Sequence, residues 1–128
     1  DVTVEDCAKL ELSIQGPCYR HKYRQHSVPE VCNYPGLNKA ENMECAKRYG
    51  AQSGKLENCS QLNEKRLRDY CKWGVAFINK DINLCRQLPD DDRFTPGLSP
   101  QDSCVTVINN YWDRSVDFWL NPVDYRAN

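Results

Sequence analysis

Apolar residues recur along most of the chain at the three- and four-residue intervals of amphipathic helices. The clearest stretch covers residues 56–88, and residues 101–120 carry a second stripe of the same period. The alternation typical of strands is brief wherever it occurs, so we expect an all-α protein. The two stripes comprise Leu62, Leu67, Tyr70, Trp73, Gly74, Phe77 and Ile78, followed by Val105, Ile108, Trp112, Val116 and Trp119.

Glycine and proline punctuate the N-terminal third of the chain. Gly16-Pro17 is expected to end a first short amphipathic stretch, because proline breaks a helix interior. A basic, aromatic helix is then expected over residues 18–26. Ser27 or Val28 is expected to start a further short helix with proline in its first turn.

The later helices each begin after a short polar residue whose side chain can accept from the first free backbone N–H groups. A glutamate three residues after the first of these caps completes a capping box. The expected starts are Asn38 (with Glu41), Asp81, and Ser99 or Asp102, for helices over residues 38–50, 82–88 and 101–120.

The cysteines are regularly spaced. Three intervals of fourteen residues separate Cys18 from Cys32, Cys45 from Cys59 and Cys71 from Cys85, and Phe118 takes the equivalent place after Cys104. Equal intervals of this kind indicate an internal repeat. We therefore expect residues 1–128 to form a single domain, a disulfide-stapled array of three to four short helical hairpin-like repeats. The repeats would start near Cys18, Cys45, Cys71 and Cys104.

Two disulfide schemes suit this spacing. Pairing across the equal intervals leaves Cys7 to join Cys104, and it requires the chain to reverse, because fourteen helical residues span about 21 Å and a disulfide needs Cα atoms within about 7 Å. Pairing neighbours in sequence uses all eight cysteines in four similar local bridges. We favour this sequential scheme, with pairs Cys7–Cys18, Cys32–Cys45, Cys59–Cys71 and Cys85–Cys104.

Composition explains why the chain needs these bridges. Leu, Val, Ile and Phe supply only 26 of the 128 residues, close to the limit below which burial of apolar surface does not offset the entropy of ordering. Each disulfide contributes about 3 kcal/mol on a loop-entropy estimate. An even number of cysteines without a CxxC spacing favours disulfides over a metal site and indicates a secreted or periplasmic protein.

Charge and hydropathy exclude two classes of partner. No run of eighteen apolar residues exists, so no membrane span is expected. The opening DVTVEDC has neither a basic nor an apolar leader, which resembles a mature chain after signal cleavage. The net charge is −1, with a mildly basic middle section over residues 18–72, and this is not the strong basic footprint of a nucleic-acid-binding protein.

Two groups of residues are candidates for binding a partner. The first is the basic helix, which carries a positive patch beside two tyrosines and suits an acidic protein surface. The second is the C-terminal set of aromatics, which either cap the array or anchor an interface. A solvated helix face remains the alternative for the first group. The predicted partner-binding residues are Tyr19, Arg20, Lys22, Tyr23, Arg24, Trp119 and Tyr125.

No catalytic, metal or cofactor signature accompanies them. The serines lack GxSxG, and the acidic pairs Glu41/Glu44 and Asp113/Asp117 have the spacing of exposed helical acids. The DDD run at residues 90–92 lacks the alternating ligands of an EF-hand loop, which favours a solvated loop. We therefore expect no enzyme activity, no metal and no cofactor.

The function expected from the sequence is that of a secreted or periplasmic binding module. An inhibitor, an immunity protein or an effector that acts by contact with an acidic protein surface would suit the stapled scaffold, because rigidity lowers the entropic cost of binding. A carrier of a small apolar ligand between helices is the alternative, although so few apolar residues make a cavity costly. A small secreted hydrolase is a third possibility.

Overall fold

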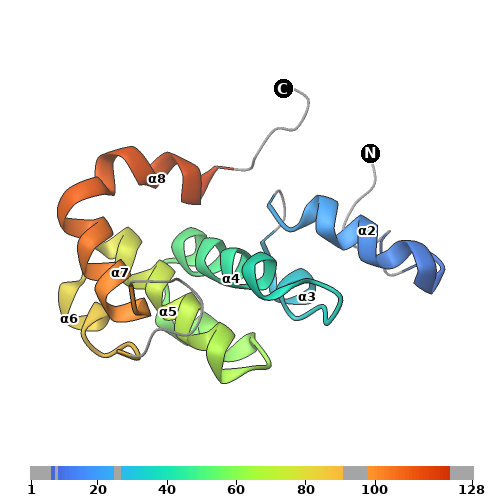
Figure 1. Cartoon of the computed structure of the whole chain (residues 1–128), viewed down its shortest axis with the longest axis horizontal. Coiled ribbons are helices and arrows are strands. Elements are labelled where there is room, and N and C mark those ends of the chain that lie inside the picture. Colours follow the sequence, from blue (N-terminus) through green and yellow to red (C-terminus); the bar gives the residue numbers. More distant parts are fainter. Residues whose placement is uncertain (1–6, 8, 25–26, 91–97, 122–128) are drawn as a thin grey trace.

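The computed structural model describes residues 7, 9–24, 27–90 and 98–121, and all regular structure within them is helical (Figure 1). The all-α class expected from the sequence is therefore confirmed. The elements are α2 (Leu12–Lys22), α3 (Pro29–Cys32), α4 (Lys39–Ser53), the 3₁₀-helix η1 (Leu56–Gln61), α5 (Lys65–Asn79), α6 (Ile82–Cys85), α7 (Pro100–Thr106), the π-helix η2 (Val107–Tyr111) and α8 (Trp112–Leu120).

Helices α4 and α5 form the centre of the molecule. In Figure 1, α4 lies between the N-terminal helices α2 and α3 on one side and α5 to α7 on the other. The two central helices approach backbone to backbone, since a Cβ atom on Gly50 would overlap the carbonyl of Cys71, and one on Gly74 would overlap that of Lys47. Any larger residue at either glycine would therefore push the pair apart.

Local signals set most helix starts as expected. Asn38 accepts from the Glu41 backbone N–H while the Glu41 carboxylate accepts from Asn38 N–H, a complete capping box. Asp81 accepts from Leu84 N–H, and Ser99 caps α7. These local hydrogen bonds confirm the caps predicted for the later helices.

The helix boundary predicted at Gly16-Pro17 was wrong. Helix α2 runs through Gly16-Pro17 instead of starting after it, with Pro17 in its interior. A proline leaves the carbonyl four residues earlier without its backbone donor. Here that residue is Ser13, which is exposed, so water can satisfy the carbonyl. The helix therefore continues at a cost that an exposed position can tolerate.

Two later stretches are more divided than their periodicity indicated. In residues 56–88 the break at Asp81 was predicted, but the separate 3₁₀-helix η1 before α5 was not. Helix α5 ends at Asn79, and the next residue, Lys80, adopts a left-handed φ of 53°. The single helix expected over residues 101–120 comprises α7, the π-turn η2 and α8. A π-turn inserts one residue into the helical repeat, and apolar spacing alone does not reveal it.

The four disulfides follow the sequential scheme. The paired Cα atoms are 5.6 Å apart for Cys7–Cys18, 5.3 Å for Cys32–Cys45, and 5.5 Å for both Cys59–Cys71 and Cys85–Cys104. The last three bridges each join a short helix to the longer helix that follows it: α3 to α4, η1 to α5 and α6 to α7. That these units are repeats of one segment stays a prediction.

The disulfides also bear on where the protein resides. Four bridges within 128 residues are consistent with an extracellular location, because disulfides persist in oxidising compartments. None of the described helices combines the length and apolar character needed to cross a membrane.

Candidate protein-binding surface

The tyrosines of the predicted basic patch belong to the core. Tyr19 and Tyr23 are only 5% and 7% exposed. The ring of Tyr19 lies 4.4 Å from that of Tyr34, and burial, with smaller contributions from Glu30 and Tyr34, raises the pKa of its phenol. This corrects the expectation that the two tyrosines form an accessible part of the patch, since each ring already packs within the protein.

The arginines of the same patch are paired within the molecule. Arg24 donates two hydrogen bonds to the Glu44 carboxylate, at 2.7 and 3.2 Å. Arg20 lies 3.7 Å from the Glu41 carboxylate and donates to the carbonyl of Gly36. Lys22 takes part in none of the ion pairs formed by the described residues. Most of the positive charge that the sequence placed here is therefore compensated by α4.

The predicted aromatic residues fall in different places. Trp119, on α8, is partly buried with its ring 5.3 Å from that of Trp73 and 4.9 Å from that of Phe118. Phe118, which takes the place of a cysteine in the predicted repeat, remains 45% exposed. Trp112 does pack inward and donates from Nε1 to the carbonyl of Phe77 at 2.7 Å. Tyr125 lies outside the described residues.

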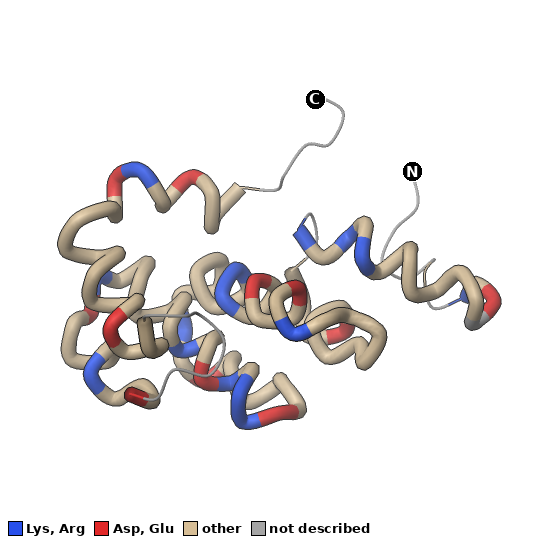
Figure 2. Tube along the Cα trace, viewed as in Figure 1, with Lys and Arg blue, Asp and Glu red and all other residues tan. Residues whose placement is uncertain are grey.

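A second basic surface lies on α5. It lines an open pocket of about 620 Å³, which we call the α5 pocket. Four of its residues occur at positions 65, 68, 69 and 72, the spacing of one helix face. Figure 2 shows lysine and arginine in blue along α5. The pocket is lined by Lys65, Arg68, Asp69 and Lys72 of α5 and by Gln87 and Pro89, which follow α6.

Positive charge predominates in the α5 pocket. Lys65 Nζ donates to Asp69 Oδ2 at 2.9 Å, so that carboxylate is engaged by one cation. Arg68 donates from one Nη atom to the carbonyl of Leu62, a neutral partner, and forms no ion pair with the acids that the structure describes. Lys72 forms none of the ion pairs found between described residues. Three cations and one carboxylate thus leave a net charge of +2 facing an open pocket.

A third group of cations lies under α8. Lys47 Nζ is 4.2 Å from the ring centroid of Trp73, 5.3 Å from that of Tyr70 and 5.6 Å from that of Trp119. Burial lowers the pKa of Lys47 to about 8, against a smaller opposing effect of Glu44. Burial also lowers the pKa of the neighbouring Arg48, again opposed by Glu44. These cations are enclosed by rings, whereas those of the α5 pocket line an opening at the surface.

The cations of the α5 pocket were not singled out from the sequence. Their signal was available, since Lys65, Arg68 and Lys72 follow one face of a helix that the apolar stripe had already indicated. Nothing in that spacing showed which basic residues of the chain would find internal carboxylates. The contributions of Gln87 and Pro89 depend on how α6 packs against α5 and have no local signal.

The acidic residues do not gather into a candidate metal cluster in the part of the chain that the structure describes. The described residues contain no group of three or more His, Cys, Asp or Glu side chains that would hold a metal ion. Asp90 accepts a hydrogen bond from the hydroxyl of Ser99, and the other two acids of the DDD run lie outside the described residues. No protein-family model, curated protein or solved structure matches the chain.

Proposed function

We propose that this protein is a secreted or periplasmic binding module that recognises an acidic surface on another protein through the α5 pocket. The observation that carries the proposal is the net charge of +2 in an open pocket, with Arg68 and Lys72 free of carboxylate partners among the described residues. Cations in a concave, low-dielectric setting attract carboxylates more strongly than cations on a flat surface. The α5 pocket, and not the basic helix expected over residues 18–26, is therefore our proposed site for an acidic partner.

The scaffold behind the pocket supports this role. Cys59–Cys71 anchors α5 to η1, and Cys71 lies on the same helix as the pocket cations. Cys85–Cys104 holds α6 in place, just before Gln87 and Pro89. A surface fixed in this way loses little conformational entropy on binding. An inhibitor, an immunity protein or an effector that works by contact would profit from such a surface.

The nature of the pocket also distinguishes this function from the alternatives. A carrier of an apolar ligand needs an apolar lining, whereas this pocket is lined mainly by charged and amide side chains. A hydrolase needs a nucleophile or an acid–base pair directed at a substrate. The one carboxylate in the pocket, Asp69, is hydrogen bonded to Lys65. Neither alternative is favoured by a specific feature of the described residues.

The test is a pull-down from the native secretome or envelope with three forms of the full-length protein. These are the wild type, Arg68→Glu/Lys72→Glu in the pocket, and Arg20→Glu/Lys22→Glu on α2, which makes the same change in net charge. We expect a stoichiometric acidic partner that is lost with the pocket variant, retained by the α2 variant and weakened by salt. Loss with the α2 variant alone would return the site to the basic helix, and no partner with any form would refute the proposal.

A further inference from the structure

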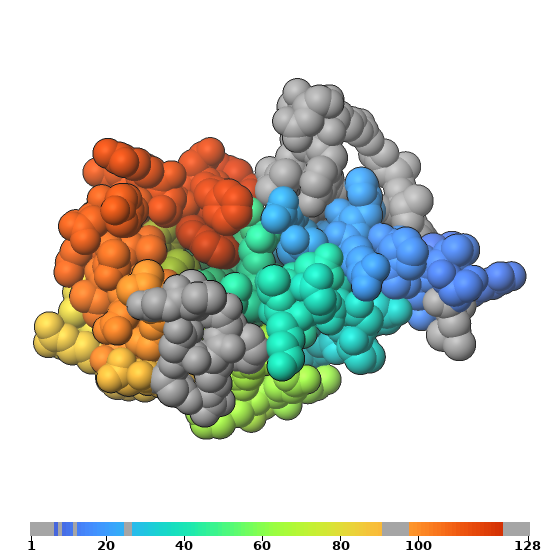
Figure 3. Space-filling model, in the orientation of Figure 1, coloured from blue at the N-terminus to red at the C-terminus, as the bar shows by residue number. Residues whose placement is uncertain are grey.

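Helix α8 covers part of α4 without being built into the core. None of its residues is buried, although Val116, Trp119 and Leu120 are partly covered. Figure 3 shows the side chains of α8 (red) lying against those of α4 (green) at the surface of the molecule. Near the end of α8, the backbone carbonyls of Leu120 and Asn121 accept from Gln52 and Arg48 of α4. These contacts fix the position of α8 with little burial.

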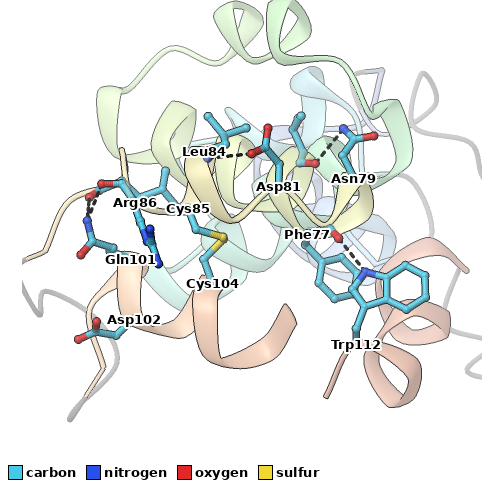
Figure 4. The surroundings of a disulfide bond; sticks show 12 residues. Phe77, Asn79, Asp81, Leu84, Cys85, Arg86, Gln101, Asp102, Cys104 and Trp112 are labelled. Atoms are coloured by element: carbon cyan, nitrogen blue, oxygen red, sulfur yellow. Dashed lines mark hydrogen bonds between the residues drawn. A yellow bond between two sulfur atoms is a disulfide. The ribbon is translucent and has the colours of Figure 1, made fainter. Parts of the chain in front are cut away.

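The segment that leads into α8 is held much more firmly. Cys85–Cys104 joins α7 to α6, and Gln101 Nε2 donates to the carbonyl of Arg86 at 2.6 Å (Figure 4). In the same view Trp112 reaches back to the carbonyl of Phe77 at the end of α5. Trp112 is the first residue of α8, so α7 and the start of α8 are both anchored. The part of α8 that follows Trp112 can thus leave α4 while α7 and Trp112 stay in place.

The surface beneath α8, which we call the covered surface, consists of Glu44, Lys47 and Arg48 of α4 with Tyr70 and Trp73 of α5. Two of its buried donors, Arg48 Nη2 and Trp73 Nε1, have no hydrogen-bond partner. The side chain of Arg48 is 0% exposed, so water does not reach it from the surface. Buried donors without partners cost about 1–3 kcal/mol each, and more when charged. The covered surface therefore contains two buried donors that could each form a further hydrogen bond.

Helix α8 places aromatic rings, and no carboxylate, next to the buried cations Lys47 and Arg48. The Arg48 guanidinium lies 4.3 Å from the centroid of Phe118 and 5.6 Å from that of Trp119, and Lys47 Nζ also faces Trp119. The carboxylates of α8, Asp113 and Asp117, are on exposed residues. Glu44 is the carboxylate that pairs with Arg48, and it is shared with Arg24. Two buried cations and one shared carboxylate leave positive charge under α8.

We propose that the covered surface is a docking site for an acidic amphipathic helix of a partner protein, which α8 shields until that helix displaces it. Such a helix would place an aromatic side chain over Lys47 and Arg48, as Trp119 does, and would add a carboxylate for the unpaired donors. Charge complementarity favours it over α8, because it gains a charged hydrogen bond that α8 does not form. This site is independent of the α5 pocket.

The proposal is tested with two synthetic peptides of residues 107–121 that differ at a single position, Ser115→Glu or Ser115→Gln. Position 115 lies one turn before Trp119 on the same helix face and is partly covered in the protein. We expect the glutamate peptide to bind the full-length protein about tenfold more tightly than the glutamine peptide, the effect of one charged hydrogen bond. Fluorescence anisotropy of labelled peptides measures this difference.

Variants of the full-length protein test the shielding by α8. Trp119→Ala removes the ring between Lys47 and Arg48, and Gln52→Ala removes a hydrogen bond from exposed α4 surface to the Leu120 carbonyl. Both should raise the affinity for the glutamate peptide, Trp119→Ala by about tenfold, since the competing contact is weakened. Gln52→Ala preserves the test if Trp119→Ala fails to fold. Leu56→Ala, on η1 and as exposed as Tyr111, is the control outside η2 and α8 and should change nothing.

Three outcomes would overturn the proposal. Equal affinity for the two peptides would remove the role of the carboxylate, and absence of binding to every variant would remove the docking site. Dimerisation of the full-length protein without peptide would assign the covered surface to a second copy of the chain. Because Arg68→Glu/Lys72→Glu leaves the covered surface intact, peptide binding by that variant separates this proposal from the proposed function.

Discussion

Helices α2 and α5 both carry lysine and arginine at helical intervals, but the surroundings of these cations differ. Arg20 of α2 and Arg24, two residues after its end, pair with Glu41 and Glu44 of α4 and help to hold the two helices together. On α5, Arg68 and Lys72 face an open pocket, and neither forms an ion pair with a carboxylate of the described residues. The comparison shows that a basic stretch is a candidate for binding only where its charges are not already neutralised within the protein.

The largest effect should come from breaking the ion pairs on the α2 side. Glu44→Ala leaves Arg48 buried without its carboxylate and also deprives Arg24 of both hydrogen bonds. We expect a loss of about 3–5 kcal/mol in the free energy of unfolding, the usual result of leaving a buried charge unpaired. Urea denaturation followed by circular dichroism measures it.

Glu41→Gln is the matched control for this loss. Its ion pair with Arg20 is at the surface, with Arg20 56% exposed, and glutamine preserves the capping box. We expect less than about 1 kcal/mol for this change. Similar losses for the two variants would show that Glu44 has no special part in joining α2 to α4.

Much of this scaffold could be predicted from the sequence because its determinants are local. Asn38 with Glu41, Asp81 and Ser99 act within three residues of themselves, and the predicted caps are those observed. The sequential disulfides followed from a spacing that gave every cysteine a neighbour. The helical continuation through Pro17 could not be predicted, because it depends on whether the carbonyl of Ser13 meets solvent.

The candidate site was harder to predict, because it depends on contacts between residues far apart in the sequence. Glu44 lies 20 residues from Arg24, and no local pattern showed that the two would meet. The burial of Tyr19 against Tyr34 also depends on how α2 packs. The cations of α5 could have been grouped by their spacing, but identifying them as available required knowledge of every carboxylate near them. Local chemistry thus predicts helices, and tertiary packing decides which charges remain for a partner.

A second prediction concerns Lys47, a buried cation that forms none of the ion pairs between described residues. The pKa of Lys47 is lowered from 10.5 to about 8 by burial, so the unfolded chain binds more protons than the folded one between these values. The wild type should therefore become more stable as the pH rises from about 8 to 10.5, and below pH 8 the full cost of burying the charge remains. Lys47→Met should lack this gain.

The size of the effect follows from the shift. Lowering the pKa of Lys47 from 10.5 to about 8 corresponds to about 3 kcal/mol. Between pH 8 and 10.5, the wild type should therefore gain this much stability relative to Lys47→Met. Urea titrations of both proteins at several pH values measure it, and ionisation of other groups cancels in the comparison. All eight cysteines are paired, so thiol exchange does not interfere. Parallel curves for the two proteins would show that Lys47 ionises normally.

The smallest effect on stability should come from replacing a cation of the α5 pocket. Comparing it with the loss of Arg24 tests most directly the difference between the two basic regions. Lys72→Gln removes a cation that has no ion pair among the described residues, so the free energy of unfolding should change by less than about 0.5 kcal/mol. Arg24→Gln, which removes the same charge just after the end of α2, should cost about 1 kcal/mol through its hydrogen bonds to Glu44. Partner binding should follow the opposite order, with Lys72→Gln weakened and Arg24→Gln unchanged. A Lys72 variant that lost stability but kept its partner would mean that α5 uses its charge as α2 does.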